Sequence, residues 1–262
     1  MNKHRIDLFF DLHGVLANLK AVSKNYDDYL ARVLLPTGIK RQKISIIHRN
    51  AFSQWLEEIK DLSKTVEDMV FDPIEFVKKY RTIDKRWENF ILKYVPKSHR
   101  ESVRPLLETK RVEYEALVFG APILYPEVQS VLDKLKEITN LRMYIASSAS
   151  SQHVKGAIEL HNLKKYFHEA IGYDTVGAPK KAKGGAYFRN MLKLTNADPK
   201  SSIFVGDSMD EAELSLKFGM YFILVDRENR IEISKKYQLP YEVVNELNEI
   251  LPLINSFVTE FL

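Results

Sequence analysis

The chain opens with a short apolar segment that ends in an acid and a glycine: residues 6–16 read IDLFFDLHGVL. A carboxylate that follows a hydrophobic strand and precedes a glycine turn lies where open α/β sheets bind ligands. Asp11 in this position is suited to act as a nucleophile, as a metal ligand, or as both. An Asp after a strand is also a common turn former or helix cap, so the interpretation depends on the rest of the chain.

Three further strand-like runs also end in polar residues. They are residues 141–146, followed by Ser147 and Ser148, residues 202–205, followed by Gly206 and Asp207, and residues 221–225, followed by Asp226 and Arg227. Amphipathic helical patterns lie between these runs, and this alternation predicts a parallel sheet covered on both faces. Because the carboxyl ends of parallel strands share one edge, we expect Asp11, Ser147 and Asp207 to meet in one crevice.

The stretch from residue 18 to residue 120 has a different pattern. Its apolar residues recur at helical spacing and predict five helical segments: residues 22–35, 44–62, 73–80, 83–94 and 98–118. A segment of this length is not a loop in a compact fold. We therefore predict a helical cap domain at residues 18–120, inserted into a core domain made of residues 1–17 and 121–262. Since the insertion follows Asp11 directly, it is expected to cover the crevice.

The composition excludes several classes of site and partner. The chain has no cysteine, which rules out disulfides, thiolate metal sites and cysteine nucleophiles. Asp7 and Asp11 interrupt the apolar stretch near the N-terminus, and no segment approaches the roughly 18 apolar residues of a membrane span. We expect no signal peptide, no membrane partner and a cytoplasmic location. A net charge of +4 is small for this length and argues neither for nor against a nucleic-acid partner, which we do not expect.

In their order, these segments resemble the motifs of the haloacid dehalogenase (HAD) superfamily, most of whose members are Mg²⁺-dependent phosphohydrolases. The resemblance covers the first 16 residues and roughly residues 120–250. Its most specific part is IFVGDSMDE at residues 203–211. It implies a Rossmann-like α/β core with a parallel sheet and an inserted all-helical cap. It also implies Mg²⁺ as the cofactor, a small phosphorylated substrate, and hydrolysis of a phosphate monoester through an aspartyl-phosphate intermediate.

The resemblance gives roles to residues on three of the strand ends. Asp11 matches the nucleophile and metal ligand, and the main-chain carbonyl of His13 matches a further metal ligand. Asp207 matches a third ligand, since magnesium prefers hard oxygen donors. Ser147, with Ser148 beside it, matches the position that binds the phosphoryl group near a helix N-terminus.

Two roles leave a choice between neighbouring residues. The superfamily has a lysine that offsets charge at the nucleophile, and residues 178–185, APKKAKGG, contain three lysines. Lys183 fits the spacing to Asp207 best and Lys181 is second. The acid that orients metal-bound water is Glu211 on register, with Asp210 as the alternative.

His13 departs from the superfamily pattern, which has a second Asp at this position. That residue acts first as a general acid and then as a base, a role that typically contributes about 10²–10⁴-fold. Histidine, with an ordinary pKa near 6.5, is able to do this. Mg²⁺ and the lysine would lower its pKa, whereas Asp11 would raise it.

Three functions are therefore open. The first is a phosphatase with His13 as the acid and base. The second is a catalytically impaired HAD-fold protein that binds a phosphorylated ligand or partner. The third is a hydrolase of phosphonates or carbon–halogen bonds. Carbon–halogen cleavage needs no metal, so Asp207 and Glu211 argue against it, and no cap lysine typical of phosphonate cleavage is identifiable.

Overall fold

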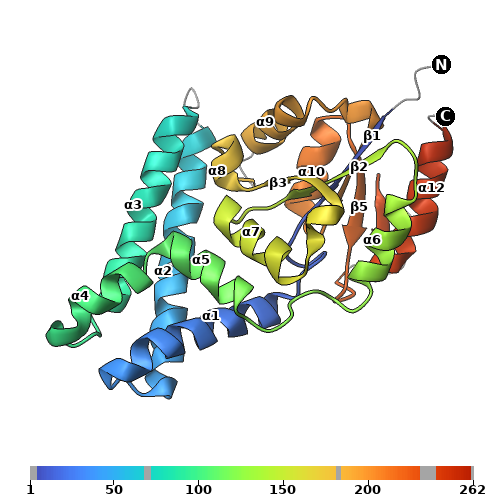
Figure 1. Ribbon diagram of the computed structural model, residues 1–262. Helices are drawn as coiled ribbons and strands as arrows, with labels where there is room; N and C mark the ends of the chain where they lie inside the picture. Colours follow the sequence, from blue (N-terminus) through green and yellow to red (C-terminus); the bar gives the residue numbers. More distant parts are fainter. Residues whose placement is uncertain (1–4, 68–71, 181–183, 231–239, 261–262) are drawn as a thin grey trace.

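The computed structural model describes residues 5–67, 72–180, 184–230 and 240–260. They form a six-stranded parallel sheet, in the order β3-β2-β1-β4-β5-β6, with helices on both faces (Figure 1). The strands are β1 (Ile6–Phe10), β2 (Leu141–Ala146), β3 (Phe167–Ile171), β4 (Ser202–Gly206), β5 (Tyr221–Val225) and β6 (Glu242–Val244). This confirms the predicted α/β fold with a helical insertion between β1 and the rest of the sheet.

The described helices fall into two groups. Those of the insertion are α1 (Leu19–Leu34), α2 (Arg41–Glu67), α3 (Pro73–Leu92), α4 (Arg100–Val103) and α5 (Thr109–Val118). Those that cover the sheet are α6 (Val128–Lys136), α7 (Ser151–Leu160), α8 (Tyr173–Val176), α9 (Ala186–Thr195), α10 (Met209–Lys217) and α12 (Ile250–Glu260). None of the helices within the described residues is both long and apolar enough to cross a membrane.

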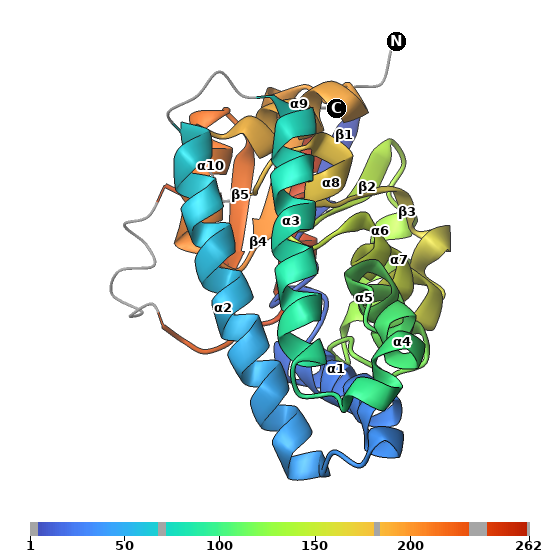
Figure 2. The same ribbon diagram turned by 90° about the vertical axis from the view of Figure 1, so that its left-hand side faces the viewer.

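The central strand β1 is buried on both faces, which explains its nearly continuous apolar sequence. Successive side chains of a strand point to opposite faces. Leu8 and Phe10 accordingly pack against α6, α7 and α12, whereas Phe9 packs against α9 and α10. The insertion has a core of its own, and its two long helices, α2 and α3, run side by side (Figure 2). Helix α5 packs against α7 and so joins the insertion to the sheet domain.

The structure differs from the sequence prediction in several places. Helices α1 and α2 begin three residues earlier than predicted, at Leu19 and Arg41. The segments predicted at residues 73–80 and 83–94 form one helix, α3, because no proline or glycine separates them. The segment predicted at residues 98–118 is instead broken near Pro105, which has no backbone N–H to donate within a helix. Strand β3 was not predicted, because this edge strand carries exposed polar residues in its middle.

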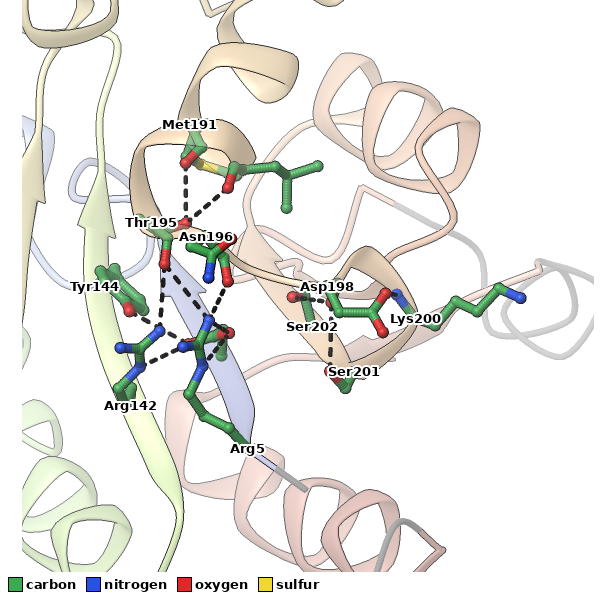
Figure 3. Close-up of polar contacts among 12 residues, drawn as sticks. Arg5, Arg142, Tyr144, Met191, Thr195, Asn196, Asp198, Lys200, Ser201 and Ser202 are labelled. Carbon is green, nitrogen blue, oxygen red and sulfur yellow. Dashed lines mark hydrogen bonds and ion pairs between the residues drawn. The ribbon is translucent and has the colours of Figure 1, made fainter. Parts of the chain in front are cut away.

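An ion-pair network around the buried carboxylate of Asp7 lies at the opposite end of β1 from Asp11. Figure 3 shows its partners. The Asp7 carboxylate is 1% exposed and accepts hydrogen bonds from the Nε atoms of Arg5 and Arg142, each at 3.0 Å. The Tyr144 hydroxyl donates to it as well, at 3.3 Å. Arg142 also donates to the carbonyl of Thr195, so the network ties β1 and β2 to the end of α9.

The substitution Asp7→Ala is expected to lower the free energy of unfolding by about 2–4 kcal/mol, because it leaves two arginines around a buried site without their counter-ion. Urea unfolding measures this. Asp61→Ala is the matched control, since Asp61 is 75% exposed in its pair with Lys64 and a surface pair contributes less than ~1 kcal/mol. Equal losses in both variants would contradict a structural role for the buried network.

Candidate active site

Two of the predicted acids meet at the carboxyl edge of the sheet. Asp11 follows β1 and Asp207 follows β4, and these strands are neighbours. The Asp11 amide donates to the carbonyl of Val205 at 2.8 Å, which extends the pairing of the two strands to the site. Carboxylate oxygens of Asp11, Asp207 and Glu211 all lie within 4.8 Å of one another. The structure therefore brings together three acids that are up to 200 positions apart in the sequence.

The loop after Asp11 requires glycine at position 14. Gly14 has a φ of +78°, in the left-handed region, and a Cβ added there would lie 2.1 Å from Oδ2 of Asp207. Arg227, which follows β5, holds the loop by donating to the carbonyls of Gly14 at 3.0 Å and Val15 at 2.8 Å. The turn thus lets the second acid approach the first closely.

A buried lysine lies between two of the acids. Lys180 is 1% exposed, and its Nζ lies 2.8 Å from Oδ1 of Asp11 and 2.6 Å from Oε1 of Glu211. Burial alone lowers the pKa of Lys180, but the two carboxylates outweigh it and the net shift is upward. Burial raises the pKa of Glu211, although Lys180 opposes this. Lys180 is therefore the cation that balances the charge of the nucleophile candidate.

This position is the one that sequence spacing assigned to Lys183, with Lys181 second. Lys181 and Lys183 lie outside the described residues, and Lys180 occupies the position beside Asp11. The number of residues between a lysine and Asp207 does not show where the lysine side chain lies in the folded chain. Lys180 itself is buried beside Asp11.

Of the two candidate outer acids, Glu211 belongs to the site. Its side chain is fully buried, and its Oε2 accepts the backbone N–H of Asp207 at 3.1 Å. Asp210, one residue earlier on α10, is exposed and is not in the group of three acids. Glu211 therefore contacts both the backbone amide of Asp207 and the ammonium group of Lys180.

The end of β2 contributes the serines. Ser147 is buried, and its Oγ accepts the backbone N–H of Ala149 at 3.1 Å. Ser148 is exposed to a cavity above the sheet, and Ser150 caps α7 by accepting the N–H of His153. β2 pairs with β1, so this helix N-terminus lies beside the strand that ends in Asp11. Such an N-terminus favours an anion.

His13 is joined to two residues that no motif indicated. Its Nε2 lies 2.8 Å from Nε2 of His153, whose Nδ1 lies 2.8 Å from the Tyr26 hydroxyl. Burial, and then Lys180, lower the pKa of His13 to about 4. Burial, and then His13, lower the pKa of His153. Both rings are neutral at pH 7, and in such a pair one Nε2 carries the shared proton while the other accepts it.

A cavity of about 410 Å³ lies between this loop and the inserted helices. His13 and Ser148 line it from the core, and Tyr26, Trp55 and Glu113 line it from the insertion. Glu113, on α5, is buried and accepts a hydrogen bond from Ser150 at 2.6 Å. Sequence patterns gave no role to Tyr26, His153 and Glu113, because each reaches the site only through tertiary contacts, and they placed Arg227 at a strand end without a role.

Glu113 predicts a measurable pH dependence. Burial raises its pKa from 4.5 to about 8, although the hydrogen bond from Ser150 opposes this. Between these values the folded chain retains a proton that the unfolded chain loses, so the free energy of unfolding falls as pH rises from 4.5 towards 8. Glu113→Gln removes this contribution, and the variant is expected to gain stability over wild type by up to ~1.4 kcal/mol per pH unit.

Urea unfolding at pH 5, 6.5 and 8 measures the difference. The exposed Glu57→Gln is the control, and it is expected to keep the slope of wild type. If the slope of Glu113→Gln also equals that of wild type, Glu113 is not a protonated buried carboxyl.

Comparison with known proteins places these features in context. The family model for haloacid dehalogenase-like hydrolases matches residues 8–217. An enolase-phosphatase E1 from Komagataella phaffii is 32% identical over 110 residues, which are 40% of this chain and 46% of that protein. A phosphoglycolate phosphatase from Aquifex aeolicus is 22% identical over 215 residues, which are 77% of this chain and 97% of that protein.

A solved structure has the same fold. The 2-haloacid dehalogenase of Pseudomonas syringae superposes with a TM-score of 0.63 at 14% identity, covering 97% of this chain and 100% of that chain. The chain therefore spans about half the length of the first phosphatase and nearly all of the other two proteins.

Proposed function

This chain belongs to the haloacid dehalogenase-like hydrolases, and we propose that it is a Mg²⁺-dependent phosphatase acting on a phosphate monoester through an aspartyl-phosphate on Asp11. The observation that carries the proposal is the close group of Asp11, Asp207 and Glu211 at the carboxyl edge of the sheet, with Lys180 between Asp11 and Glu211. The two sequence relatives described above are phosphatases by name, which supports a phosphate ester as the substrate class.

The donor atoms fit magnesium. Mg²⁺ takes oxygen ligands at about 2.0–2.1 Å, so ligands on opposite sides lie ~4.2 Å apart. Oxygens of Asp11 and Asp207 lie within 4.8 Å of each other, which is compatible with two ligands of one ion. Both Glu211 oxygens already contact Lys180 and the Asp207 amide, so Glu211 would orient the site rather than bind the metal directly. The family resemblance adds the main-chain carbonyl of His13. When bound, Mg²⁺ would neutralise charge on the phosphoryl group.

The other roles in the proposed reaction fall to side chains of this protein. Lys180 holds the Asp11 carboxylate in position through an ion pair of 2.8 Å. Ser147 and the N-terminus of α7 would hold the phosphoryl oxygens. Neutral His13 is suited to take a proton from the water that cleaves the aspartyl-phosphate. With a pKa of about 4, it protonates a leaving group poorly at pH 7. We therefore expect esters with good leaving groups to be preferred.

We also propose that residues 18–120 act as a cap that closes over the site. Asn25 of α1 bonds to the returning chain at Ala121 in both directions, through Nδ2 to the carbonyl at 2.8 Å and from the amide to Oδ1 at 2.9 Å. These two hydrogen bonds join the segment that enters the insertion to the segment that returns to the core. A cap of this kind excludes water and adds substrate contacts.

The variant His13→Asp is expected to keep or raise phosphatase activity, because it restores the carboxyl acid and base of the superfamily pattern. His13→Ala is the comparison, and its kcat is expected to fall by about 10²-fold or more. Steady-state kinetics on one phosphomonoester, with Mg²⁺, measures both. Loss of activity to background in His13→Asp would show that His13 has a specific role other than acid and base catalysis.

The proposed function is tested by release of inorganic phosphate from p-nitrophenyl phosphate and a panel of phosphomonoesters between pH 5 and 8. Turnover that needs Mg²⁺ and is lost with EDTA supports it. The absence of turnover at every pH, in a folded protein, overturns it.

A second candidate is a protein that binds a phosphorylated ligand without hydrolysis. It is favoured by the neutral state of His13 and by its contact with His153, which together reduce its capacity as an acid. Mg²⁺-dependent binding of a phosphomonoester without turnover would support this alternative.

A further inference from the structure

The cavity above the candidate site has the size of a small-molecule pocket, for which about 300–1,000 Å³ is typical. On the core side it is lined by His13 and Ser148, which lie just beyond the ends of strands β1 and β2. Its walls come from four helices of the insertion, α1, α2, α3 and α5. The organic part of an ester held at Asp11 would therefore extend into this space.

The charge of the walls restricts that organic part. Among the lining residues that the structure describes there is no lysine or arginine. The only carboxylic acid is Glu113, and its raised pKa keeps it largely protonated at pH 7. A second anionic group on the substrate would lose its hydration here without gaining a cation as partner, which is costly.

The walls are instead aromatic and aliphatic. Phe52 and Trp55 of α2 stack with their ring centroids 5.8 Å apart, and Trp87 of α3 lines the same space. Phe52 is 47% exposed and Leu19 is 53% exposed, and both line the cavity. These large apolar side chains thus continue the apolar lining outwards to solvent.

We propose that the substrate is the phosphate monoester of an uncharged, largely apolar group, with a ring or chain that packs against Phe52, Trp55 and Trp87. This inference rests on the proposed phosphatase function. The polar groups of the lining residues include hydroxyl groups, three imidazoles and the carboxyl of Glu113, which suits hydrogen bonds from such a group and no ionic contact.

A matched pair of esters tests the proposal by turnover. 4-Propylphenyl phosphate and the phosphate ester of 3-(4-hydroxyphenyl)propanoate have similar size and similar phenol leaving groups, but the second carries a carboxylate. We expect kcat/KM to be at least tenfold higher for the first. Lengthening a 4-alkyl chain should raise kcat/KM by roughly fourfold per buried CH₂ until the cavity is filled. An equal or higher value for the carboxylate ester would overturn the proposal.

Binding provides a readout that does not need turnover. The only two tryptophans of the chain, Trp55 and Trp87, both line the cavity. In Asp11→Asn, with Mg²⁺ present, 4-propylphenyl phosphate is expected to change tryptophan fluorescence with at least tenfold tighter affinity than the carboxylate ester. If neither ester is hydrolysed but this preference is seen, the proposed phosphatase function fails and the pocket assignment stands. If the esters are hydrolysed or bound without a preference for 4-propylphenyl phosphate, the pocket assignment is wrong and the proposed phosphatase function is unaffected.

Two substitutions on α2 test whether the preference for the apolar ester arises in this cavity. Phe52→Lys places a cation in the cavity and is expected to reduce the preference for the apolar ester at least tenfold. Ile46→Lys is the matched control, because Ile46 is also an exposed apolar residue of α2, at 50%, and does not line the cavity. It should keep the preference of the unsubstituted protein. The same change in both variants, or in neither, would contradict the assignment of specificity to this pocket.

Discussion

Replacing Asp11 by Asn is expected to lower kcat by at least ~10³-fold, because the amide has the shape of the carboxylate but cannot attack phosphorus. Asp11 is 4% exposed and contacts Lys180 and the Leu12 amide, so Asn is the replacement that disturbs the packing least. The measurement is phosphate release with Mg²⁺. Acid-quenched wild type is also expected to retain labelled phosphate on the protein, and the variant none.

Asp210→Asn is the matched control for this experiment. Asp210 is an exposed acid on α10 next to Glu211, outside the group of three acids. It is expected to keep most of the activity. If Asp11→Asn keeps more than a tenth of the wild-type kcat while both variants remain folded, Asp11 is not the nucleophile and a covalent aspartyl-phosphate is excluded.

Lys180→Met is expected to reduce both stability and activity. Methionine fills a similar volume but leaves Asp11 and Glu211 close together, buried and without their shared cation. The loss is expected to be about 3–5 kcal/mol at pH 8. Burial and Asp11 already raise the pKa of Glu211 from 4.5, and Lys180 is what opposes them. The folded variant would therefore hold a proton that the unfolded chain loses, and its stability would fall as pH rises above 4.5.

Urea unfolding at pH 5 and pH 8 tests the direction of this pH dependence. The free energy of unfolding of Lys180→Met should be closer to that of wild type at pH 5. Activity is expected to fall by ~10²-fold or more, because Lys180 no longer offsets charge at the nucleophile. Lys181→Met and Lys183→Met decide between the lysines of this loop. If Lys183→Met loses activity and Lys180→Met does not, the assignment from sequence spacing is correct and the one from the structure is wrong.

The sequence alone was sufficient for the core fold and for the place of the site. Strand patterns are local, with apolar runs of five or six residues that stop at a polar residue, and the order of these runs predicts a parallel sheet. Because parallel strands end at one edge, Asp11, Ser147 and Asp207 could be expected on it without coordinates. Local rules failed at the edge strand β3, at the break near Pro105 and at the bounds of the inserted helices.

The tertiary structure alone decided which neighbouring residues serve the site. Lys180 is placed in the site by its distances to Asp11 and Glu211, and Glu211 rather than Asp210 by its burial and its distance to the other two acids. The pKa of His13 falls because the folded chain covers it and brings Lys180 near it. The apolar cavity is assembled from four helices of the insertion and from core residues that include His13 and Ser148. Desolvation and Coulomb energies depend on distances in the folded state, which the spacing of residues along a chain does not contain.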